Sequence, residues 1–543
     1  MRLKILFAVF AIVFHSLSVE ANKINDNEFL DGIGDTLTQA PDNWFNLDAE
    51  ANDVRGISTE KAYSELLKNK KSNTIIVAIL DSGIDTDHED LKNNIWINEK
   101  EIAGNGIDDD NNGYTDDIYG WNFIGGKDGT HVEMDTWEVT RLYKIYKEKF
   151  ENKDINSLTK NEKKEYDQYL EVKKYYENEL ENASRTYNYI KKLYEKFIES
   201  ETLINKLFDT EDWTTAQLKG ITSDEKDIID AQKFLLNMIN ANYTKKDMLG
   251  GIEHFEKLIK FKLNLDHDPR SIVGDNYNDK TEKYYGNNLV KGPEPFHGTH
   301  VAGIIGAERN NGIGMNGIAD NVKFMVLRTV PSGDERDKDV ANSIYYAVDN
   351  GAKIINMSFG KSFSPDKEYV DKAFKYAEKN GVLIVHAAGN DAADNDKIKN
   401  FPHRQYINSK DECNTWIEVG ASSWEGNANF VGSFSNYGKI NVDLFAPGVD
   451  IYSTTPEQNY ESASGTSMAA PVVTGVAALV WSYYPELTAK ELKSILIESA
   501  IDYGDEAVKL PGEKDKTVKF NKLSKTGGII NAYIAILMAE KLK

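Results

Sequence analysis

Short runs of β-branched and other apolar residues recur along this chain, and they constrain its fold more than any other feature. Each run is long enough for one strand, and continuous apolar runs suit strands that are buried on both faces of a sheet. Amphipathic stretches with helical spacing lie between several of them, for example at residues 340–349 and 369–380. Strands that alternate with helices predict a parallel α/β sheet. The runs occupy residues 74–79, 322–326, 353–357, 382–386 and 416–420.

Residues from about 131 to 265 interrupt this alternation, because glycine nearly disappears and Lys, Glu, Asn and Tyr dominate. A capping box from Thr159 to Glu162 predicts the start of a long helix. Its apolar positions are spaced by four and three residues, with Lys173 as the one exception, and this heptad spacing is typical of a coiled coil. These positions are Tyr169, Tyr176, Leu180, Ala183, Tyr187, Ile190, Tyr194 and Phe197.

Further capping boxes, from Thr222 to Glu225 and from Thr244 to Asp247, predict two more helices in the same region. We therefore expect a large all-helical, coiled-coil-like segment, residues 131–289, inserted into the α/β domain. Two roles remain open for this insertion. It is either a solvated helical spacer or an arm that contacts a substrate or a partner protein.

The composition describes a globular protein with a large core, since 40% of the 543 residues are hydrophobic. Length alone predicts about two or three domains. The formal net charge of −23 argues against a nucleic-acid partner, because phosphate binding needs clustered Lys and Arg. Cys413 is the single cysteine, so an intrachain disulfide is excluded.

The N-terminus has the pattern of a secretory signal. Arg2 and Lys4 precede an apolar run at residues 6–14, and a small-x-small cleavage site follows at 19–21. The alternative, a membrane-spanning helix, needs about 20 apolar residues, and this run is shorter. We expect a signal peptide at residues 1–21, export to a periplasm or the extracellular space, and no membrane span in the mature chain.

Three local motifs far apart in the chain carry residues suited to nucleophilic catalysis. Asp81 ends the first strand-like run, in ILDSGID; His297 opens HGTHVAG; Ser467 lies in SGTSMAAP. A serine hydroxyl becomes a nucleophile when imidazole removes its proton, and a carboxylate orients that imidazole. Asp81 is expected at the carboxyl end of a strand, where α/β sheets build their sites. Ser467 is expected at a helix N-terminus, which favours negative charge.

These motifs, in the order Asp, His, Ser, resemble those of the subtilase family of subtilisin-like serine peptidases. The resemblance covers roughly residues 74–125 and 290–543, and it implies a doubly wound, mostly parallel α/β sheet. It implies that Asp81, His297 and Ser467 form a catalytic triad. It also implies that Asn390, in AAGN, completes an oxyanion hole with the backbone N–H of Ser467.

The resemblance further implies a binding site for protein or peptide substrates in an extended conformation. One segment would pair with the substrate backbone by strand addition, and a second would form the other wall of the pocket for the P1 side chain. The first segment is Ser358, Phe359 and Gly360, and the second is Ala387, Ala388 and Gly389.

Two further histidines compete for the catalytic role. His300 lies one helical turn after His297, so only one of the two can face the cleft, and the resemblance assigns catalysis to His297. His300 is then expected to be a structural core residue. His131, in GTHV, lacks both the preceding His and the following Ala-Gly of the motif, so it is not expected to be catalytic.

The Asp-rich segment from 108 to 119 predicts a structural Ca²⁺ site. Oxygen-bearing side chains stand at positions 1, 3, 5 and 9 of an EF-like loop, with glycine at position 6. Position 12 is Tyr119 rather than a bidentate Glu, so the full motif fails, and an Asx-rich turn without an ion is the alternative. The predicted ligands are Asp108, Asp110, Asn112, Asp116 and Asp117.

The resemblance implies a second calcium site at Asp90 and Asn311. No cofactor is expected for catalysis itself. The predicted organisation is an N-terminal extension at 22–73 that packs on the peptidase domain, the two parts of that domain at 74–130 and 290–543, and the insertion between them.

The expected function is that of an exported serine endopeptidase that works through an acyl-enzyme on Ser467. One alternative is an inactive subtilase scaffold that binds a partner through its helical insertion. A metal-dependent hydrolase that uses the Asp-rich loop lacks the His ligands such enzymes need.

Overall fold

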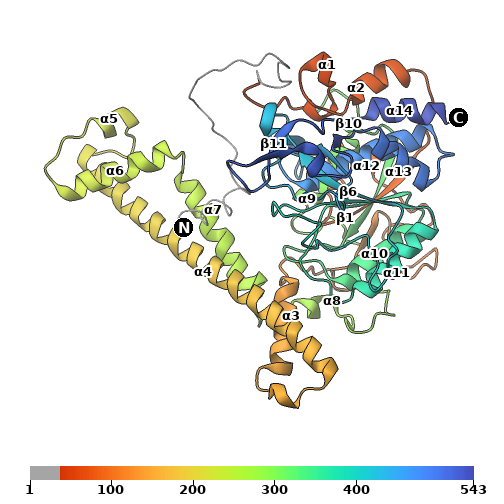
Figure 1. Cartoon of the computed structure of the whole chain (residues 1–543), viewed down its shortest axis with the longest axis horizontal. Coiled ribbons are helices and arrows are strands. Elements are labelled where there is room, and N and C mark those ends of the chain that lie inside the picture. The colour runs from red at the N-terminus through yellow and green to blue at the C-terminus, as the bar shows by residue number, and fades with distance from the viewer. Residues whose placement is uncertain (1–36, 543) are drawn as a thin grey trace. The chain divides into compact units, whose positions relative to one another are not determined.

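The computed structural model describes residues 37–542, and these form two compact units (Figure 1). One unit, here called the α/β unit, contains the described residues up to Glu133 and those from Pro269 onward. The other, here called the helical unit, is Met134–Asp268. The predicted signal peptide lies outside the described residues.

The centre of the α/β unit is a sheet of nine strands among the described residues, in the order β10-β13-β7-β6-β5-β4-β1-β3-β2. Its strands pair in parallel except for β10 with β13. Each of the five predicted runs forms a strand of this sheet, so the predicted α/β fold is confirmed. The strands are β1 (Ile75–Asp81), β2 (Gly120–Asn122), β3 (Val322–Arg328), β4 (Ile354–Met357), β5 (Leu383–Ala387), β6 (Trp416–Ser422), β7 (Leu444–Pro447), β10 (Ile501–Asp502) and β13 (Gly528–Ile529).

Helices cover both faces of the sheet. Since successive strand residues point to opposite faces, one strand can contribute to two separate core clusters. Along β1, Val77 and Ile79 belong to a core cluster that includes residues of α9, α12, α13 and α14, whereas Ala78 and Leu80 belong to a second cluster with residues of α10 and α11. The helices are α9 (Phe296–Gly306), α10 (Asp337–Asp349), α11 (Lys367–Lys379), α12 (Thr466–Tyr483), α13 (Ala489–Glu498) and α14 (Ala532–Lys541).

Helix α12 is long and apolar enough to cross a membrane by length and composition, but 89% of that stretch is buried inside the structure. Its contacts with strands β4, β5, β6 and β7 make it a core helix of the sheet. Two hairpins complete the α/β unit: β8 (Ile451–Thr455) pairs with β9 (Asn459–Ala463), and β11 (Ala507–Lys509) pairs with β12 (Thr517–Lys519).

The strand order changes direction at β1, which lies between β4 and β3. The chain therefore moves to one side of β1 for β2 and β3 and to the other side for β4. In open α/β sheets such a switch point opens a crevice at the carboxyl ends of the strands. Asp81, the last residue of β1, lies at this point.

The described part of the predicted N-terminal extension packs on the α/β unit. Trp44 and Phe45 are fully buried in the first core cluster. Arg55 bonds to Glu506 at 3.0 Å and stacks over the ring of Phe430. The short helices of this region are η2 (Trp44–Asn46), α1 (Ala49–Asn52), α2 (Thr59–Lys61) and η3 (Ala62–Leu66).

The helical unit is organised along α4, a helix of 49 residues that begins at the predicted capping box of Thr159 and Glu162 (Figure 1). Helices α3, α6 and α7 contact it. The predicted seam positions of α4 are all buried or half-buried, although a coiled coil in the strict sense stays a prediction. The unit contains α3 (Glu138–Phe150), η5 (Ile155–Ser157), α4 (Lys160–Phe208), α5 (Thr215–Lys219), α6 (Lys226–Asn240), α7 (Lys245–Lys257) and η6 (Leu258–Lys262).

Of the other two capping boxes predicted in this unit, one is confirmed and one is wrong. Thr244 and Asp247 form the box that opens α7. Thr222 does not cap α6, whose N-cap is Glu225 with no side-chain hydrogen bond. The box at this place in the chain lies earlier, from Thr214 to Gln217, at the start of α5.

The helical unit is shorter than the expected insertion of residues 131–289, because the chain rejoins the α/β unit at Pro269. The cause is a buried polar network. Arg270, in α8 (Arg270–Val273), forms ion pairs of 2.6 Å with Asp275 and with Asp339 of α10. The hydroxyl of Tyr285 donates to the same Asp339 at 2.7 Å.

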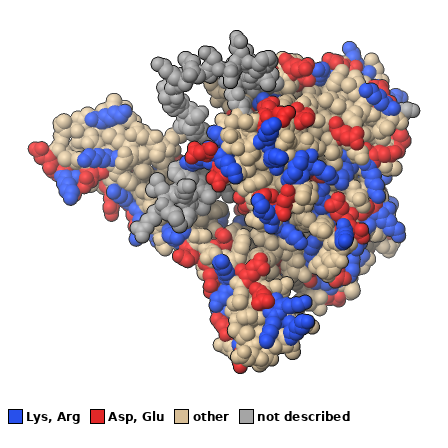
Figure 2. All heavy atoms as spheres, viewed as in Figure 1, with Lys and Arg blue, Asp and Glu red and all other residues tan. Residues whose placement is uncertain are grey.

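On the face shown in Figure 2, Lys and Arg are interspersed with Asp and Glu. That face shows no broad basic stripe of the kind that nucleic-acid binding requires.

Candidate active site

Asp81 is buried at the carboxyl end of β1. The backbone N–H of Ser82 donates to its Oδ1 at 2.7 Å. Helix α9 comes close to this strand end because residue 298 is glycine: a Cβ there would lie 2.2 Å from the Gly83 carbonyl oxygen and 3.2 Å from Asp81 Cβ. A larger residue at 298 would therefore push the first turn of α9 away from Asp81.

His297 lies in that first turn of α9. Its Nδ1 is 2.8 Å from Asp81 Oδ1 and 3.0 Å from Oδ2. An ionised carboxylate can only accept, so Nδ1 carries the proton and Nε2 keeps a lone pair. Burial lowers the pKa of His297, but the charge and the hydrogen bond of Asp81 outweigh burial and raise the pKa above its usual value. With its side chain 37% exposed, the ring is accessible from outside.

Ser467 is the second residue of α12, which begins directly after Gly465. Its hydroxyl donates to the Ser358 carbonyl at 3.1 Å, and the Ser358 hydroxyl donates to the Ser467 carbonyl at 2.9 Å. These reciprocal bonds join the end of β4 to the start of α12. The position at a helix N-terminus favours negative charge on or near Ser467.

Asn390 follows β5 and is oriented by Thr466. Its Oδ1 accepts from the backbone N–H and from the hydroxyl of Thr466, each at 2.9 Å. A backbone N–H can only donate, so the amide atom that faces it must be the oxygen. The amide nitrogen is thereby turned away from Thr466 and makes no hydrogen bond with a residue of the described chain, which leaves it free to donate to a ligand.

A pocket of about 240 Å³ lies beside Ser467 and Asn390. Four of the six predicted substrate-binding residues line it, namely Phe359 and Gly360 together with Ala387 and Gly389. The other two do not. Ser358 is buried and holds Ser467, whereas Ala388 is buried and its N–H donates to the Val419 carbonyl.

Three further residues that line this pocket were not predicted: Asp391, Asn400 and Thr466. Asp391 and Thr466 each adjoin a predicted residue in the chain, and this adjacency was the only available signal. Asn400 gives no local signal, because it reaches the pocket through a loop.

The two competing histidines lie in other settings. His300 is fully buried, its Nε2 lies 3.1 Å from the Glu461 carbonyl, and burial lowers its pKa to about 4. His131 lies 3.2 Å from the Asn122 amide, beside the end of the edge strand β2. Neither histidine hydrogen-bonds to Asp81 in the described structure.

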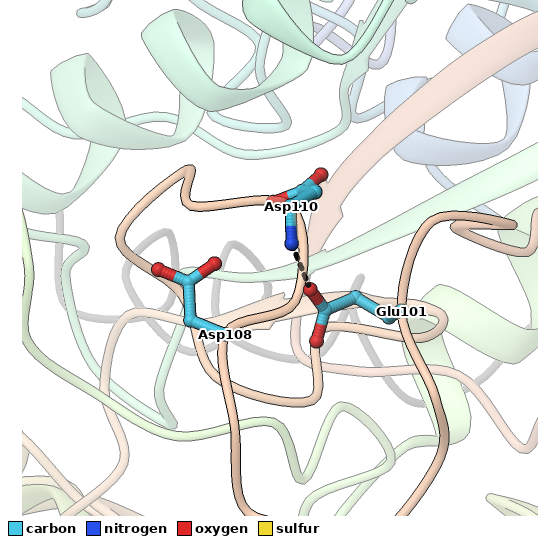
Figure 3. A group of neighbouring side chains, drawn as sticks. All are labelled: Glu101, Asp108 and Asp110. Atoms are coloured by element: carbon cyan, nitrogen blue, oxygen red, sulfur yellow. Dashed lines mark hydrogen bonds between the residues drawn. The ribbon is translucent and has the colours of Figure 1, made fainter.

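The Asp-rich segment brings two of its predicted ligands together with a residue that was not predicted. Oxygens of Glu101, Asp108 and Asp110 all lie within 4.8 Å of one another (Figure 3). Glu101 organises this loop, because its Oε1 accepts from the N–H groups of Asp109 and Asp110 at 2.8 and 3.1 Å. Three carboxylates at this spacing suit Ca²⁺, which takes oxygen ligands.

The remaining predicted ligands of this loop face other partners. Asp116 accepts from the N–H groups of Asn105 and Gly106. Asn112 donates to Asp117 at 2.9 Å, and the hydroxyl of Tyr346 also donates to Asp117. Burial raises the pKa of Asp117 to about 6 despite these bonds.

Asp90 and Asn311 also lie together, at 2.6 Å, but Asn311 turns its amide nitrogen toward Asp90. The Asn311 oxygen accepts from the N–H of Ile313, which fixes this orientation. Asp90 accepts further bonds from Met315 and Tyr460. The pair offers a single carboxylate, whereas three carboxylates converge at Glu101, so the pair fits a cation less well than that group.

The comparisons with known proteins agree with this fold. The model of the Subtilase family matches residues 72–525, so the chain belongs to that family. Subtilisin DY of Bacillus licheniformis is 36% identical over 212 residues, which cover 38% of this chain and 72% of that protein.

Two further relatives show similar levels of identity. Thermitase of Thermoactinomyces vulgaris is 40% identical over 187 residues, which cover 34% of this chain and 61% of the relative. The Thermophilic serine proteinase of Bacillus sp. (strain AK1) is 41% identical over 187 residues, which cover 34% of this chain and 42% of the relative. The chain therefore matches only part of the length of these two relatives.

Proposed function

We propose that this protein is a serine endopeptidase that hydrolyses peptide bonds through an acyl-enzyme on Ser467. The observation that carries the proposal is the pocket in which Ser467 meets the outward-facing amide of Asn390. The Asp81–His297 pair adds the base that such a serine needs. Membership of the subtilase family supports the same reaction.

In the proposed mechanism, Ser467 Oγ attacks the carbonyl carbon of the scissile bond while His297 Nε2 accepts the hydroxyl proton. Asp81 stays ionised and stabilises the imidazolium. The oxyanion that forms accepts hydrogen bonds from Asn390 Nδ2 and from the backbone N–H of Ser467. The C–N bond then breaks as His297 returns the proton to the leaving amine. Water, with His297 again as base, hydrolyses the resulting ester and releases the acid.

Substrates are proposed to bind as an extended strand beside Phe359 and Gly360. The backbone groups of these two residues make no hydrogen bond with any residue from 37 to 542, so they are free to pair with a peptide. The reciprocal bonds between Ser358 and Ser467 would hold this segment in register with the nucleophile.

The experiment that tests the proposal is labelling with a fluorophosphonate, which reacts with an activated serine, followed by a peptidase assay. The intact protein should be labelled at Ser467 and should cleave an unstructured protein substrate. Ser467→Ala should lose both properties while it keeps its circular dichroism spectrum. Labelling elsewhere, or substantial cleavage by the variant, would show that the nucleophile is a different residue. No observation favours the inactive scaffold as a second function.

The proposal has three further parts. A structural Ca²⁺ would be held by Glu101, Asp108 and Asp110, whose carboxylates fit it, and it would stabilise the fold without taking part in catalysis. Export rests on the pattern of the N-terminal residues. The helical unit is proposed to select among protein substrates, and it contributes none of the proposed catalytic residues.

A further inference from the structure

The side chain of Asn400 forms part of the wall of the pocket beside Ser467, and its amide oxygen is a hydrogen-bond acceptor there. Asn400 Nδ2 donates to the carbonyls of Ala387 and Ala388, at 3.3 and 3.1 Å. Carbonyls only accept, so these bonds fix the amide and leave its Oδ1 on the opposite side. A Cβ on Gly360 would lie 2.5 Å from that Oδ1, so Asn400 spans the pocket from one wall to the other.

The second acceptor in the pocket is the carboxylate of Asp391. Its backbone N–H donates to Asn436 Oδ1 at 2.9 Å, which holds the main chain in place. The carboxylate itself makes no hydrogen bond or ion pair with a described residue, and neither does Asn400 Oδ1. Asp391 is exposed, and partial desolvation, with no cation from residues 37–542 paired to its carboxylate, raises its pKa.

The other two aspartates of the same loop differ from Asp391 in this respect. Asp394 forms an ion pair of 2.6 Å with Lys397. Asp396 accepts from the N–H groups of Ile440 and Asn441, at 3.1 and 2.9 Å. Bonds within the described chain therefore account for Asp394 and Asp396, whereas Asp391 lines the pocket with an exposed carboxylate that no residue from 37 to 542 pairs.

The size and the remaining wall of the pocket indicate what kind of ligand group enters. Its volume of about 240 Å³ is below the roughly 300–1,000 Å³ of sites that enclose a whole small molecule, so it suits one side chain. Phe359 forms an apolar wall on which the stem of a long side chain can pack. An apolar side chain would desolvate the acceptors of Asp391 and Asn400 without pairing them, which is unfavourable.

We propose that this pocket takes the P1 side chain and that it selects lysine or arginine, with Asp391 as the counter-charge and Asn400 as a second acceptor. This inference rests on the proposed function and names its substrate class. The enzyme would cleave after basic residues. The stem of the P1 residue would lie along Phe359, and its cationic head would form an ion pair with the carboxylate of Asp391.

The test uses fluorogenic peptides that differ only at P1, with arginine, lysine, phenylalanine, or citrulline as the neutral isostere of arginine. The intact protein should prefer arginine or lysine. Asp391→Asn keeps the shape of the side chain and should lower the ratio of kcat/KM between arginine and citrulline by about tenfold, or about 1.4 kcal/mol. A ratio is used so that any general loss of activity cancels.

Asp394→Asn is the matched control, since it removes the same charge three positions along the chain and should leave the ratio unchanged. Asp391→Lys should reverse the preference, so that an added peptide with glutamate at P1 is cleaved faster than the arginine peptide. Efficient cleavage after phenylalanine or citrulline, or an unchanged ratio in Asp391→Asn, would overturn the inference while the proposed function stands. If the protein cleaves none of the peptides and Ser467 is not labelled, the proposed function fails, and the inference fails with it.

Discussion

Replacing Asn390 by alanine removes a donor that is needed when negative charge develops on the substrate oxygen. Two bonds of 2.9 Å from Thr466 already hold Oδ1, so Nδ2 is oriented before the reaction begins. Removal of one such donor costs about 2.7–4 kcal/mol of transition-state stabilisation. At about 1.36 kcal/mol per factor of ten, kcat should fall by about 10²–10³.

The Michaelis constant should change little, because an interaction made mainly in the transition state lowers kcat and kcat/KM together. Alanine also removes the acceptor for the buried N–H and hydroxyl of Thr466, so the free energy of unfolding should fall by about 0.5–2 kcal/mol. The assay is steady-state cleavage of a chromogenic peptide, with a denaturant titration alongside. Asn390→Asp is the matched control: it keeps the acceptor for Thr466 without the donor, and should be at least as slow. A fall in kcat of less than about tenfold, or a raised KM at constant kcat, would refute the role assigned to Nδ2.

Three other predictions test separate parts of the molecule. Since Asp81 raises the pKa of His297 and the protonated ring cannot accept a proton, kcat/KM should fall as pH drops through that pKa. Asp81→Asn should move this acid limb to lower pH, and an unmoved limb in the pH–rate profile would contradict the assignment. Replacing residues 134–268 with a Gly-Ser linker should preserve cleavage of small peptides and change selection among proteins. Loss of small-peptide cleavage in a folded variant would make the helical unit part of the catalytic site. EGTA should lower the melting temperature in calorimetry, and Asp108→Asn should remove that shift; an unchanged melting curve in EGTA argues against bound Ca²⁺.

The strands and the long helix could be predicted because their signals are local. Residues 74–79 are a continuous run that is mostly β-branched, and residues 75–79 of it lie in β1 (Ile75–Asp81). The capping box at Thr159 starts α4, because its two side chains bond each other's backbone. The similar pattern at Thr222 was misleading: such a pattern permits a cap without requiring one, and α6 begins with no side-chain hydrogen bond at its N-cap.

The Asp-rich segment shows what spacing along the chain cannot predict. The EF-like spacing singled out Asp108 and Asp110, whose carboxylates lie beside that of Glu101, but it also assigned Asp116, whose carboxylate accepts from Asn105 and Gly106. Glu101 escaped prediction because it precedes the loop and joins it only when the chain folds back.

By itself, the sequence determined five strands of the sheet, the starts of α4 and α7, and the residues suited to the chemistry, since these depend on spacing along the chain. Tertiary structure decided which groups face one another. It brought His297 to Asp81, 216 residues away in the chain, because Gly298 lets a helix approach the end of β1. It also placed Asn400 beside Gly360 in the pocket and left the carboxylate of Asp391 without a hydrogen bond or ion pair to residues 37–542. These relations depend on how the loops after the strands pack, and no periodicity in the sequence records that packing.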